Sequence, residues 1–194
     1  MTYANLIKEL HRCGFHKDIV QSFEKVDRAL FVPKHLQEYA YNNEPLPLAS
    51  GSTISQPTTI AFMIDILDTA NVNSIAEVGS GSGYVIALLS EHEPSAHIVG
   101  YEINESLVKI AESALKKYKN CVIHSVSGFK MKGKYDRILV SAEVQEEKDI
   151  EFFKSHLTPQ GVLVVPYQSA ILRYDNASKR TRTFPGFAFV PLSN

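Results

Sequence analysis

The chain has 194 residues, of which 44% are hydrophobic and 21% are charged, and its formal net charge is -1. This length and apolar content are typical of one globular domain with a sizeable core, so we predict a single domain over residues 1–194. The near-neutral charge excludes a global electrostatic field that would recruit nucleic acid or an anionic membrane surface. No stretch approaches the length and apolar character of a membrane span.

The cysteines and histidines give no sign of a metal site or of disulfide bonding. Cys13 and Cys121 lie far apart in the chain, and none of the seven histidines has a ligand-like neighbour. Cysteines used in this way are typical of reduced packing residues, so we expect a soluble cytoplasmic protein without a bound metal. No long amphipathic helix is left over for self-association, and we therefore expect a monomer.

The N-terminal part of the chain, residues 3–40, has the apolar spacing of helices. Apolar positions recur at intervals of three and four residues, at Leu6, Ile7, Leu10, Ile19, Val20, Phe23 and Val26. Gly14 interrupts the pattern, and Pro33 ends it because proline disfavours helix in the residue before it. We expect this part to pack on the main body as a helical cap.

An irregular segment follows over residues 39–57, with three prolines, a glycine and several hydroxyl side chains. This composition predicts a loop, and long ordered loops in compact domains are often functional. The loop leads into a helix that has Pro57 in its first turn. Ser55 or Gln56 is a candidate for the side chain that caps this helix.

From residue 74 onward, strand-like and helix-like segments alternate. The predicted strands are 74–78, 96–101, 121–126, 135–141 and 161–166, and the predicted helices are 84–91, 104–118 and 146–157. This alternation predicts an α/β fold, a doubly wound and mostly parallel Rossmann-like sheet with helices on both faces and ligands at the carboxyl ends of its strands. Two late antiparallel strands, 171–174 and 187–191, complete the prediction, with a polar turn at 175–178 between them.

A glycine-rich segment is the most informative motif. An apolar run ends in Glu77, and glycines then occupy every second position at Gly79, Gly81 and Gly83. A dinucleotide-binding fingerprint is spaced G-x-G-x-x-G and places a pyrophosphate on the helix that follows, which Glu77 would repel. The acid instead suits a cationic ligand, and the pattern E-x-G-x-G-x-G is similar to that of doubly wound, class I methyltransferases, which bind S-adenosyl-L-methionine (SAM).

A second acid supports a nucleoside ligand. Glu102 ends the next predicted strand, about 20 residues after the glycines, which is the interval expected for an acid that binds ribose hydroxyls. Because the carboxyl ends of neighbouring parallel strands meet at one edge of a sheet, Glu77 and Glu102 are expected to face one ligand.

Several further stretches, spread over nearly the whole chain, are found together in one family. They are Phe31-Val32-Pro33, Ala40-Tyr41 with Pro45-Leu46-Pro47, Thr53-Ile54-Ser55-Gln56-Pro57, Glu77 to Tyr84, Tyr135-Asp136-Arg137-Ile138, Leu157-Thr158-Pro159-Gln160-Gly161 and Phe189-Val190-Pro191-Leu192. With them the chain resembles the protein-L-isoaspartate (D-aspartate) O-methyltransferase family. The T-I-S-Q-P stretch is the most particular of these motifs, because the glycine loop is shared by most doubly wound methyltransferases.

The resemblance implies an enzyme that methylates isoaspartyl carboxyl groups of damaged proteins or peptides as a repair step. Residues 1–57 would then form the N-terminal helices and a substrate-side loop, and residues 58–194 the SAM-binding core. Ser55, together with Thr53, would contact the acceptor carboxylate beside the SAM methyl group. The implied cofactor-binding residues are Glu77, Gly79, Ser80, Gly81, Gly83, Tyr84, Glu102, Ile103, Ser127 and Gly128.

The chemistry agrees with these residue types. An acceptor carboxylate is already ionised at pH 7, so its attack on the methyl group needs alignment rather than a general base or a metal. Two positions depart from the family pattern. Ser127 replaces an aspartate beside the adenine, which predicts weaker SAM binding, and Glu143 replaces a small residue near the acceptor pocket, where we expect it to repel an anionic substrate.

Three functions stay open at this point. The first is an isoaspartyl methyltransferase, and the second is a SAM-dependent methyltransferase of the same descent with another peptide or a nucleic-acid acceptor. The stretch Ser141-Ala142-Glu143-Val144 lacks the Asn/Asp-Pro-Pro-aromatic turn that grips an exocyclic amine, which argues against a nucleic-acid base. The third is a non-catalytic relative that binds SAM or a protein.

Overall fold

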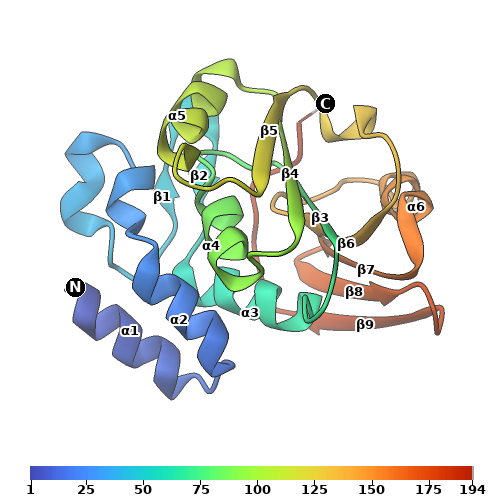
Figure 1. Ribbon diagram of the computed structural model, residues 1–194, viewed down its shortest axis with the longest axis horizontal. Coiled ribbons are helices and arrows are strands. Elements are labelled where there is room, and N and C mark those ends of the chain that lie inside the picture. Colours follow the sequence, from blue (N-terminus) through green and yellow to red (C-terminus); the bar gives the residue numbers. More distant parts are fainter. Residues whose placement is uncertain (194) are drawn as a thin grey trace.

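The computed structural model describes residues 1–193, and its centre is a seven-stranded sheet (Figure 1). The strands are ordered β5-β4-β3-β6-β7-β8-β9 across the sheet. Their bounds are β3 Ser74–Val78, β4 His97–Glu102, β5 Cys121–Ser125, β6 Tyr135–Val140, β7 Leu157–Tyr167, β8 Ala170–Asp175 and β9 Arg180–Pro185. The first five pair in parallel, and β8 and β9 pair antiparallel, so the predicted fold class is confirmed.

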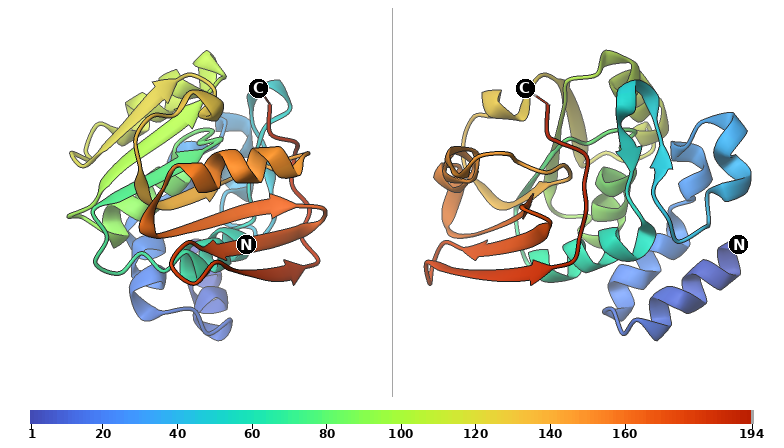
Figure 2. Two further views of the ribbon diagram at one scale, coloured as in Figure 1. Left: turned by 90° about the vertical axis from the view of Figure 1, so that its right-hand side faces the viewer. Right: turned by 180° about the vertical axis from the view of Figure 1, so that it is seen from behind.

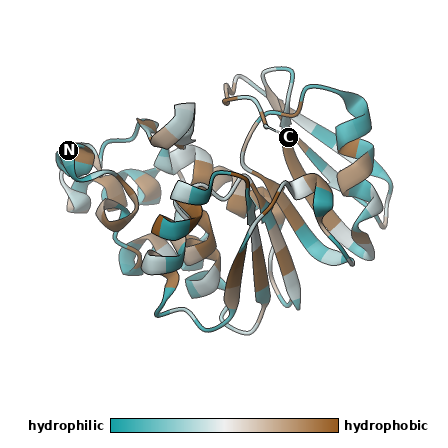
Figure 3. Ribbon diagram, turned by 90° about the horizontal axis from the view of Figure 1, so that it is seen from above, coloured by the Kyte–Doolittle hydropathy of each residue, from teal (hydrophilic) through white to brown (hydrophobic). Residues whose placement is uncertain are grey.

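The central strands are buried on both sides, and they carry the continuous apolar runs that parallel sheets require. Figure 3 shows these strands as largely hydrophobic ribbons in the middle of the molecule. Four helices follow the loop: α3 Pro57–Leu67, α4 Tyr84–His92, α5 Glu105–Leu115 and α6 Glu147–Ser155. Apolar residues of α3, α4 and α5 share one core cluster, and those of α6 share a second cluster with the opposite side of the sheet. Helices therefore cover both faces.

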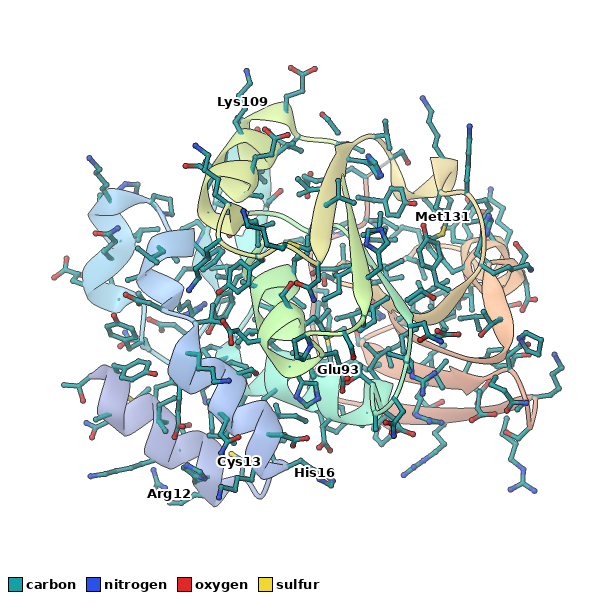
Figure 4. All side chains as sticks on the ribbon, viewed as in Figure 1. Arg12, Cys13, His16, Glu93, Lys109 and Met131 are labelled. Carbon is teal, nitrogen blue, oxygen red and sulfur yellow. The ribbon has the colours of Figure 1, made fainter. Side chains whose placement is uncertain are left out.

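The N-terminal cap is confirmed and is built from two α-helices and two short 3₁₀ helices. These are α1 Tyr3–Arg12, α2 Lys17–Lys25, η1 Arg28–Phe31 and η2 Lys34–Tyr39. Gly14 ends the first helix with a positive φ of 79°, which explains the interruption in the pattern. Cys13, labelled in Figure 4 at the corner between α1 and α2, is exposed, and Cys121 is half-buried; both are free thiols.

The segment 39–57 is mostly irregular, as predicted, but it also contains a small antiparallel pair. β1 Leu46–Pro47 pairs with β2 Thr53–Ile54, and the short helix η3 Ala49–Gly51 turns the chain between them. Two-residue strands leave no alternation to detect in a sequence. The pair stands beside the sheet and separate from it, as the cyan ribbons on the right side of Figure 2 show.

The predicted strand at 187–191 is wrong, and the last strand is β9, which begins directly after the polar turn. β9 pairs with β8 from Asp175↔Arg180 to Ala170↔Pro185 and carries alternating threonines. Pro185 and Gly186, whose φ is 93°, end the strand. The aromatic residues that suggested a strand pack on the core instead, because Phe187 stacks on Phe62 of α3 with ring centroids 5.4 Å apart.

After β9 the chain runs as an extended tail toward the carboxyl edge of the sheet. In Figure 2 this dark red tail passes between the sheet and the β1–β2 pair. The tail is fixed by backbone hydrogen bonds with Glu143, three residues after β6, where Glu143 N–H donates to Val190 O and Leu192 N–H donates to Glu143 O. No helix formed by residues 1–193 has the length and apolar character needed to cross a membrane.

Candidate active site

A cavity of about 310 Å³ opens at the carboxyl ends of β3, β4 and β6. This is the edge at which open α/β sheets bind ligands. Its walls are Ser50, Ser52, Thr53, Val78, Gly79, Gly81, Tyr101, Glu102, Ile103, Asn104, Gly128, Ser141, Ala142, Val190, Pro191, Leu192 and Ser193. We call it the cofactor cavity, and five of the predicted cofactor residues line it: Gly79, Gly81, Glu102, Ile103 and Gly128.

The glycine loop lies directly between β3 and α4. Gly79 and Gly81 have φ of 77° and 55°, a region that other residues adopt at a cost, so the sequence needs glycine there. The N–H of Gly79 donates to Tyr101 O at 2.9 Å and ties the loop to β4. A bare backbone therefore forms this wall of the cavity, and a ligand can lie against it without meeting a Cβ.

Glu77, the last acid before the glycines, is buried with 1% of its surface exposed. Its Oε1 accepts a hydrogen bond of 2.7 Å from Ser141 Oγ, while its Oε2 has no partner in residues 1–193. Burial, followed by the charge of Glu102, raises its pKa from the usual 4.5 to about 8. A buried carboxylate oxygen without a partner is costly, and a cationic or hydrogen-bond-donating ligand would satisfy it.

Glu102 lies at the tip of β4, as the spacing predicted. Its Oε2 accepts from the Gly81 N–H at 2.8 Å, and its Oε1 accepts from the Asn104 N–H at 2.9 Å. A carboxylate offers about four acceptor positions, so each oxygen can accept a further hydroxyl. Ile103 is 40% exposed beside it, at the mouth of the cavity. This arrangement suits a ribose with an apolar ring next to it.

The turn after β5 brings only one of its two predicted residues to the cofactor cavity. Gly128 lines it, and a Cβ there would stand 2.3 Å from Val78 Cγ1, so no larger residue fits. Ser127 is not among the lining residues, and its Oγ caps the short helix η4 Gly128–Lys130 by accepting from the Phe129 N–H at 3.3 Å.

Three other predicted cofactor residues, in the glycine loop or directly after it, do not line the cofactor cavity. Ser80 and Tyr84 line a small adjoining space of about 30 Å³, which Glu77 also faces. Tyr84 additionally packs on Phe31, with ring centroids 5.3 Å apart. Gly83 lines neither space, and a Cβ there would stand 3.0 Å from Ala111 Cβ, so this glycine permits close packing of α4 against α5.

A second hollow of about 410 Å³, the acceptor groove, adjoins the cofactor cavity. Its walls are Pro45, Thr53, Ser55, Gln56, Thr59, Ser141, Gly186, Phe187, Ala188, Phe189 and Val190. Thr53, Ser141 and Val190 line both hollows, so the two spaces meet at these residues. The structure therefore brings Thr53 and Ser55 together beside the cofactor cavity.

Neither Ser55 nor Gln56 caps α3 with its side chain, so this expectation is wrong. Gln56 occupies the N-cap position without a side-chain cap bond. Asn43, from the turn after η2, supplies the acceptor, because its Oδ1 receives the N–H of Thr58 at 3.1 Å. Among residues 1–193, the Ser55 hydroxyl has no recorded hydrogen-bond partner, which leaves it available to a ligand in the groove.

Glu143 lies next to the acceptor groove, because its N–H donates to the carbonyl of Val190, but Glu143 itself lines neither hollow. Its Oε1 instead accepts from the Ser169 N–H at 2.9 Å, at the tight turn between β7 and β8. The chain direction at this point is set by the tail, which pairs with the Glu143 backbone. The Glu143 carboxylate thus stabilises the turn between β7 and β8.

Sequence reasoning missed several residues that the structure adds to the site. Ser141 follows β6 and lines both hollows, and Asn104 caps α5 while lining the cofactor cavity. Ser141 had a detectable signal, because it ends the strand beside β3. The tail residues Val190, Pro191 and Leu192 belong to a family motif, but the motif did not indicate their place at the cofactor cavity, because that position depends on where β9 ends. Within residues 1–193, no three His, Cys, Asp or Glu side chains gather as a metal site would require.

The fold and the site define a class of protein. A doubly wound sheet, a glycine loop against a cavity, one acid for a cation and a second for a ribose are the features of a SAM-dependent methyltransferase. The sequence matches the model of the protein-L-isoaspartate(D-aspartate) O-methyltransferase family over residues 1–194. The chain belongs to this family.

Individual relatives agree with this assignment. The protein-L-isoaspartate O-methyltransferase of Methanothrix thermoacetophila is 34% identical over 184 residues, which cover 90% of this chain and 87% of the relative. The enzyme of the same name from Pelotomaculum thermopropionicum is 39% identical over 171 residues, covering 86% and 72%. A crystal structure assigned to this activity from Plasmodium falciparum, in complex with S-adenosyl-L-homocysteine, has a TM-score of 0.84 at 21% identity and covers 100% and 99%, which shows the shared fold.

Proposed function

We propose that this protein is a carboxyl O-methyltransferase that transfers the methyl group of SAM to isoaspartyl residues of damaged proteins or peptides. The observation that carries the proposal is the junction of the two hollows at Thr53 and Ser141, with the Ser55 hydroxyl on the acceptor side. A methyl donor in one space and a carboxylate in the other would meet at this junction. Membership in the family supports the choice of acceptor.

The residues of the cofactor cavity and of the small adjoining space that Glu77 faces fit SAM. Glu77 would hold a cationic group of the amino-acid part with its unpartnered Oε2, and Glu102 would hold the ribose hydroxyls. Gly79 and Gly81 would let the cofactor lie against the backbone, and Gly128 leaves room beside Val78. When bound, SAM supplies an electrophilic methyl group on a positively charged sulfur. We propose that Ser80, Gly83, Tyr84 and Ser127 support this site from behind the loop and from the η4 turn.

The acceptor side works by alignment. Its described lining residues include hydroxyls but no lysine, arginine or histidine, so nothing there would bind the carboxylate so tightly that it lost its nucleophilicity. Hydroxyls of Ser55 and Thr53 can donate to one carboxylate oxygen and leave the other free to attack the methyl carbon in line. The acceptor is ionised at pH 7, so no residue has to remove a proton.

The broader organisation forms part of the same proposal. Residues 1–194 act as one catalytic domain, in which residues 1–57 supply the acceptor side and residues 58–194 the cofactor core. The protein acts as a cytoplasmic monomer without a metal. The free thiols of Cys13 and Cys121 support a reducing compartment.

The test is transfer of label from methyl-tritiated SAM to an isoaspartyl peptide, with the same peptide containing normal aspartate as its matched control. The expected result is base-labile methyl ester on the isoaspartyl peptide alone. Label on both peptides or on RNA would point to another acceptor. SAM binding without any transfer would contradict an enzyme.

Ser127→Asp is expected to strengthen SAM binding by about three- to tenfold, because a charged acceptor forms stronger hydrogen bonds than a hydroxyl. Aspartate is also a good N-cap, so the η4 turn that Ser127 now caps would be kept. Calorimetric titration of the two proteins measures the change, and Ser127→Asn provides a neutral control of similar size. Equal SAM affinity of Ser127→Asp and wild type would show that this side chain stays turned toward η4.

A further inference from the structure

Arg28, at the start of η1, is almost completely buried, with 1% of its surface exposed. A buried guanidinium is costly unless hydrogen bonds satisfy it. Burial lowers its pKa to about 10, so the side chain is still charged at pH 7. In the part of the chain that the structure describes, its recorded hydrogen-bond partners are all backbone carbonyl oxygens.

These carbonyls belong to two segments that are separate in the sequence. In the turn after η2, Nη1 donates to the carbonyl oxygens of Ala40 at 2.8 Å and Asn42 at 3.3 Å, and Nη2 donates to Glu44 O at 3.2 Å. At the end of β2, Nη2 also donates to Ile54 O at 3.4 Å and Ser55 O at 3.0 Å. One buried cation thus joins both ends of the loop that forms the acceptor side.

The position of Ser55 depends on this cation. Its carbonyl is held from inside by Arg28, and its hydroxyl lines the acceptor groove. The same turn carries Asn43, which caps α3, and leads into Pro45, which also lines the groove. Without a cation, these inward-pointing carbonyl dipoles would repel one another and lack partners, and the loop would have to rearrange.

We propose that Arg28 is a positioning residue for methyl transfer, which fixes the acceptor loop over residues 40–55 and thereby aims the Ser55 hydroxyl at the substrate carboxylate. This inference rests on the proposed function and adds to it a residue outside both hollows. Arg28 lines neither the cofactor cavity nor the acceptor groove, so it acts through the loop backbone.

Lysine cannot replace this side chain. Arginine presents five donors in a rigid planar fork, and here the two terminal nitrogens of the fork serve two different segments. Lysine keeps the charge but concentrates it on one nitrogen, which can reach only part of this carbonyl set. Arg28→Lys therefore keeps the positive charge and removes the planar fork, so it tests the geometry of the fork alone.

The test compares Arg28→Lys with the matched control Arg137→Lys. Arg137 is also buried, and its Nε donates to the carbonyl oxygen of Asp68 at 2.6 Å. It lies in β6, before the carboxyl end of that strand, and it lines neither hollow. Both variants are assayed well below their melting temperatures. For Arg28→Lys we expect kcat/KM for the isoaspartyl peptide to fall by about 10- to 100-fold, with SAM affinity within about twofold of wild type. Arg137→Lys should keep the peptide kinetics of the wild type.

Backbone amide hydrogen exchange gives a second readout that needs no activity. Exchange over residues 40–59 should accelerate in Arg28→Lys and not in Arg137→Lys, while the glycine loop at 79–83 stays as in the wild type. If the wild type fails to methylate the peptide, the proposed function fails. Amide hydrogen exchange over residues 40–59 still shows whether Arg28 fixes the acceptor loop. Equal losses of kcat/KM in the two variants, a parallel loss of SAM affinity, or unchanged exchange over 40–59 would each overturn the proposal.

Discussion

Ser55→Ala is expected to lower kcat for isoaspartyl peptide by about 10- to 100-fold while leaving SAM affinity within about twofold of wild type. The expected loss of kcat corresponds to one hydrogen bond between a hydroxyl and a charged carboxylate, which contributes about 1.5–3 kcal/mol. We expect kcat and SAM affinity to respond differently because Ser55 lines the acceptor groove and is absent from the walls of the cofactor cavity, and it reaches the cofactor side only through the small adjoining space that Glu77 faces. Steady-state kinetics and calorimetric SAM titration measure the two sides independently.

Thr58→Ala is the control for this experiment. Its Oγ1 donates to Asn43 Oδ1 at 3.0 Å near the start of α3 and accepts from Gln56 Nε2 at 3.0 Å, so the variant disturbs the beginning of the helix at a residue that itself lines neither hollow. It should cost some thermal stability and little activity. A Ser55→Ala protein that behaves like Thr58→Ala would reduce Ser55 to a structural residue of the loop.

The second large effect is expected for Glu77→Gln, which should lower SAM affinity. Glutamine preserves the size of the side chain and can still accept from Ser141 Oγ, but it cannot ionise, as the buried Glu77 can when a cationic ligand binds beside it. We expect SAM affinity to fall about 10- to 100-fold, because a hydrogen bond to a charged partner is replaced by a neutral one. S-adenosyl-L-homocysteine keeps the amino group and lacks the charged sulfur, so an equal loss for both ligands would assign the contact to the amino group.

The same variant should change how stability depends on pH. In the free folded protein the pKa of Glu77 is raised from 4.5 to about 8, so the folded state holds its proton more tightly than the unfolded chain does. The resulting contribution of Glu77 to the free energy of unfolding is fully present below about pH 4.5 and is lost as pH rises to about 8. It amounts to a few kcal/mol as an order of magnitude. Glu77→Gln should remove this downward slope, as denaturant unfolding at several pH values would show.

Glu143→Gln is a suitable control, since Glu143 is also an acid near the carboxyl edge of the sheet but lines neither hollow. Its SAM affinity should match the wild type. If Glu77→Gln binds SAM as well as the wild type and keeps the slope with pH, then Glu77 serves only the packing of β3.

The cofactor side was predictable because its determinants are local. An apolar strand, an acid and alternating glycines occupy one continuous stretch, and Glu102 follows at the spacing of a neighbouring parallel strand. The acceptor side was predictable chiefly through the family's T-I-S motif around Ser55. Its geometry was not, since Ser55 is held by Arg28 and α3 is capped by Asn43, both from distant parts of the chain.

The errors have a similar origin. The run at 187–191 has the composition of a strand, but Pro185 and Gly186 end the sheet before it, and Phe187 stacks on Phe62 of α3 instead. Glu143 was expected near the acceptor pocket, where its charge would repel an anionic substrate, but it lines neither hollow. Pairing of its backbone with Val190 and Leu192 turns it toward Ser169 instead, and nothing local to Glu143 indicates that contact.

Glu102 is held through both carboxylate oxygens by the N–H groups of Gly81 and Asn104 before any ligand arrives. Ordering a free side chain during binding costs about 0.5–1.5 kcal/mol, and for this carboxylate that entropy has already been lost during folding. The acid proposed to bind the ribose is therefore preorganised, and a nucleoside should bind to it as to a rigid surface.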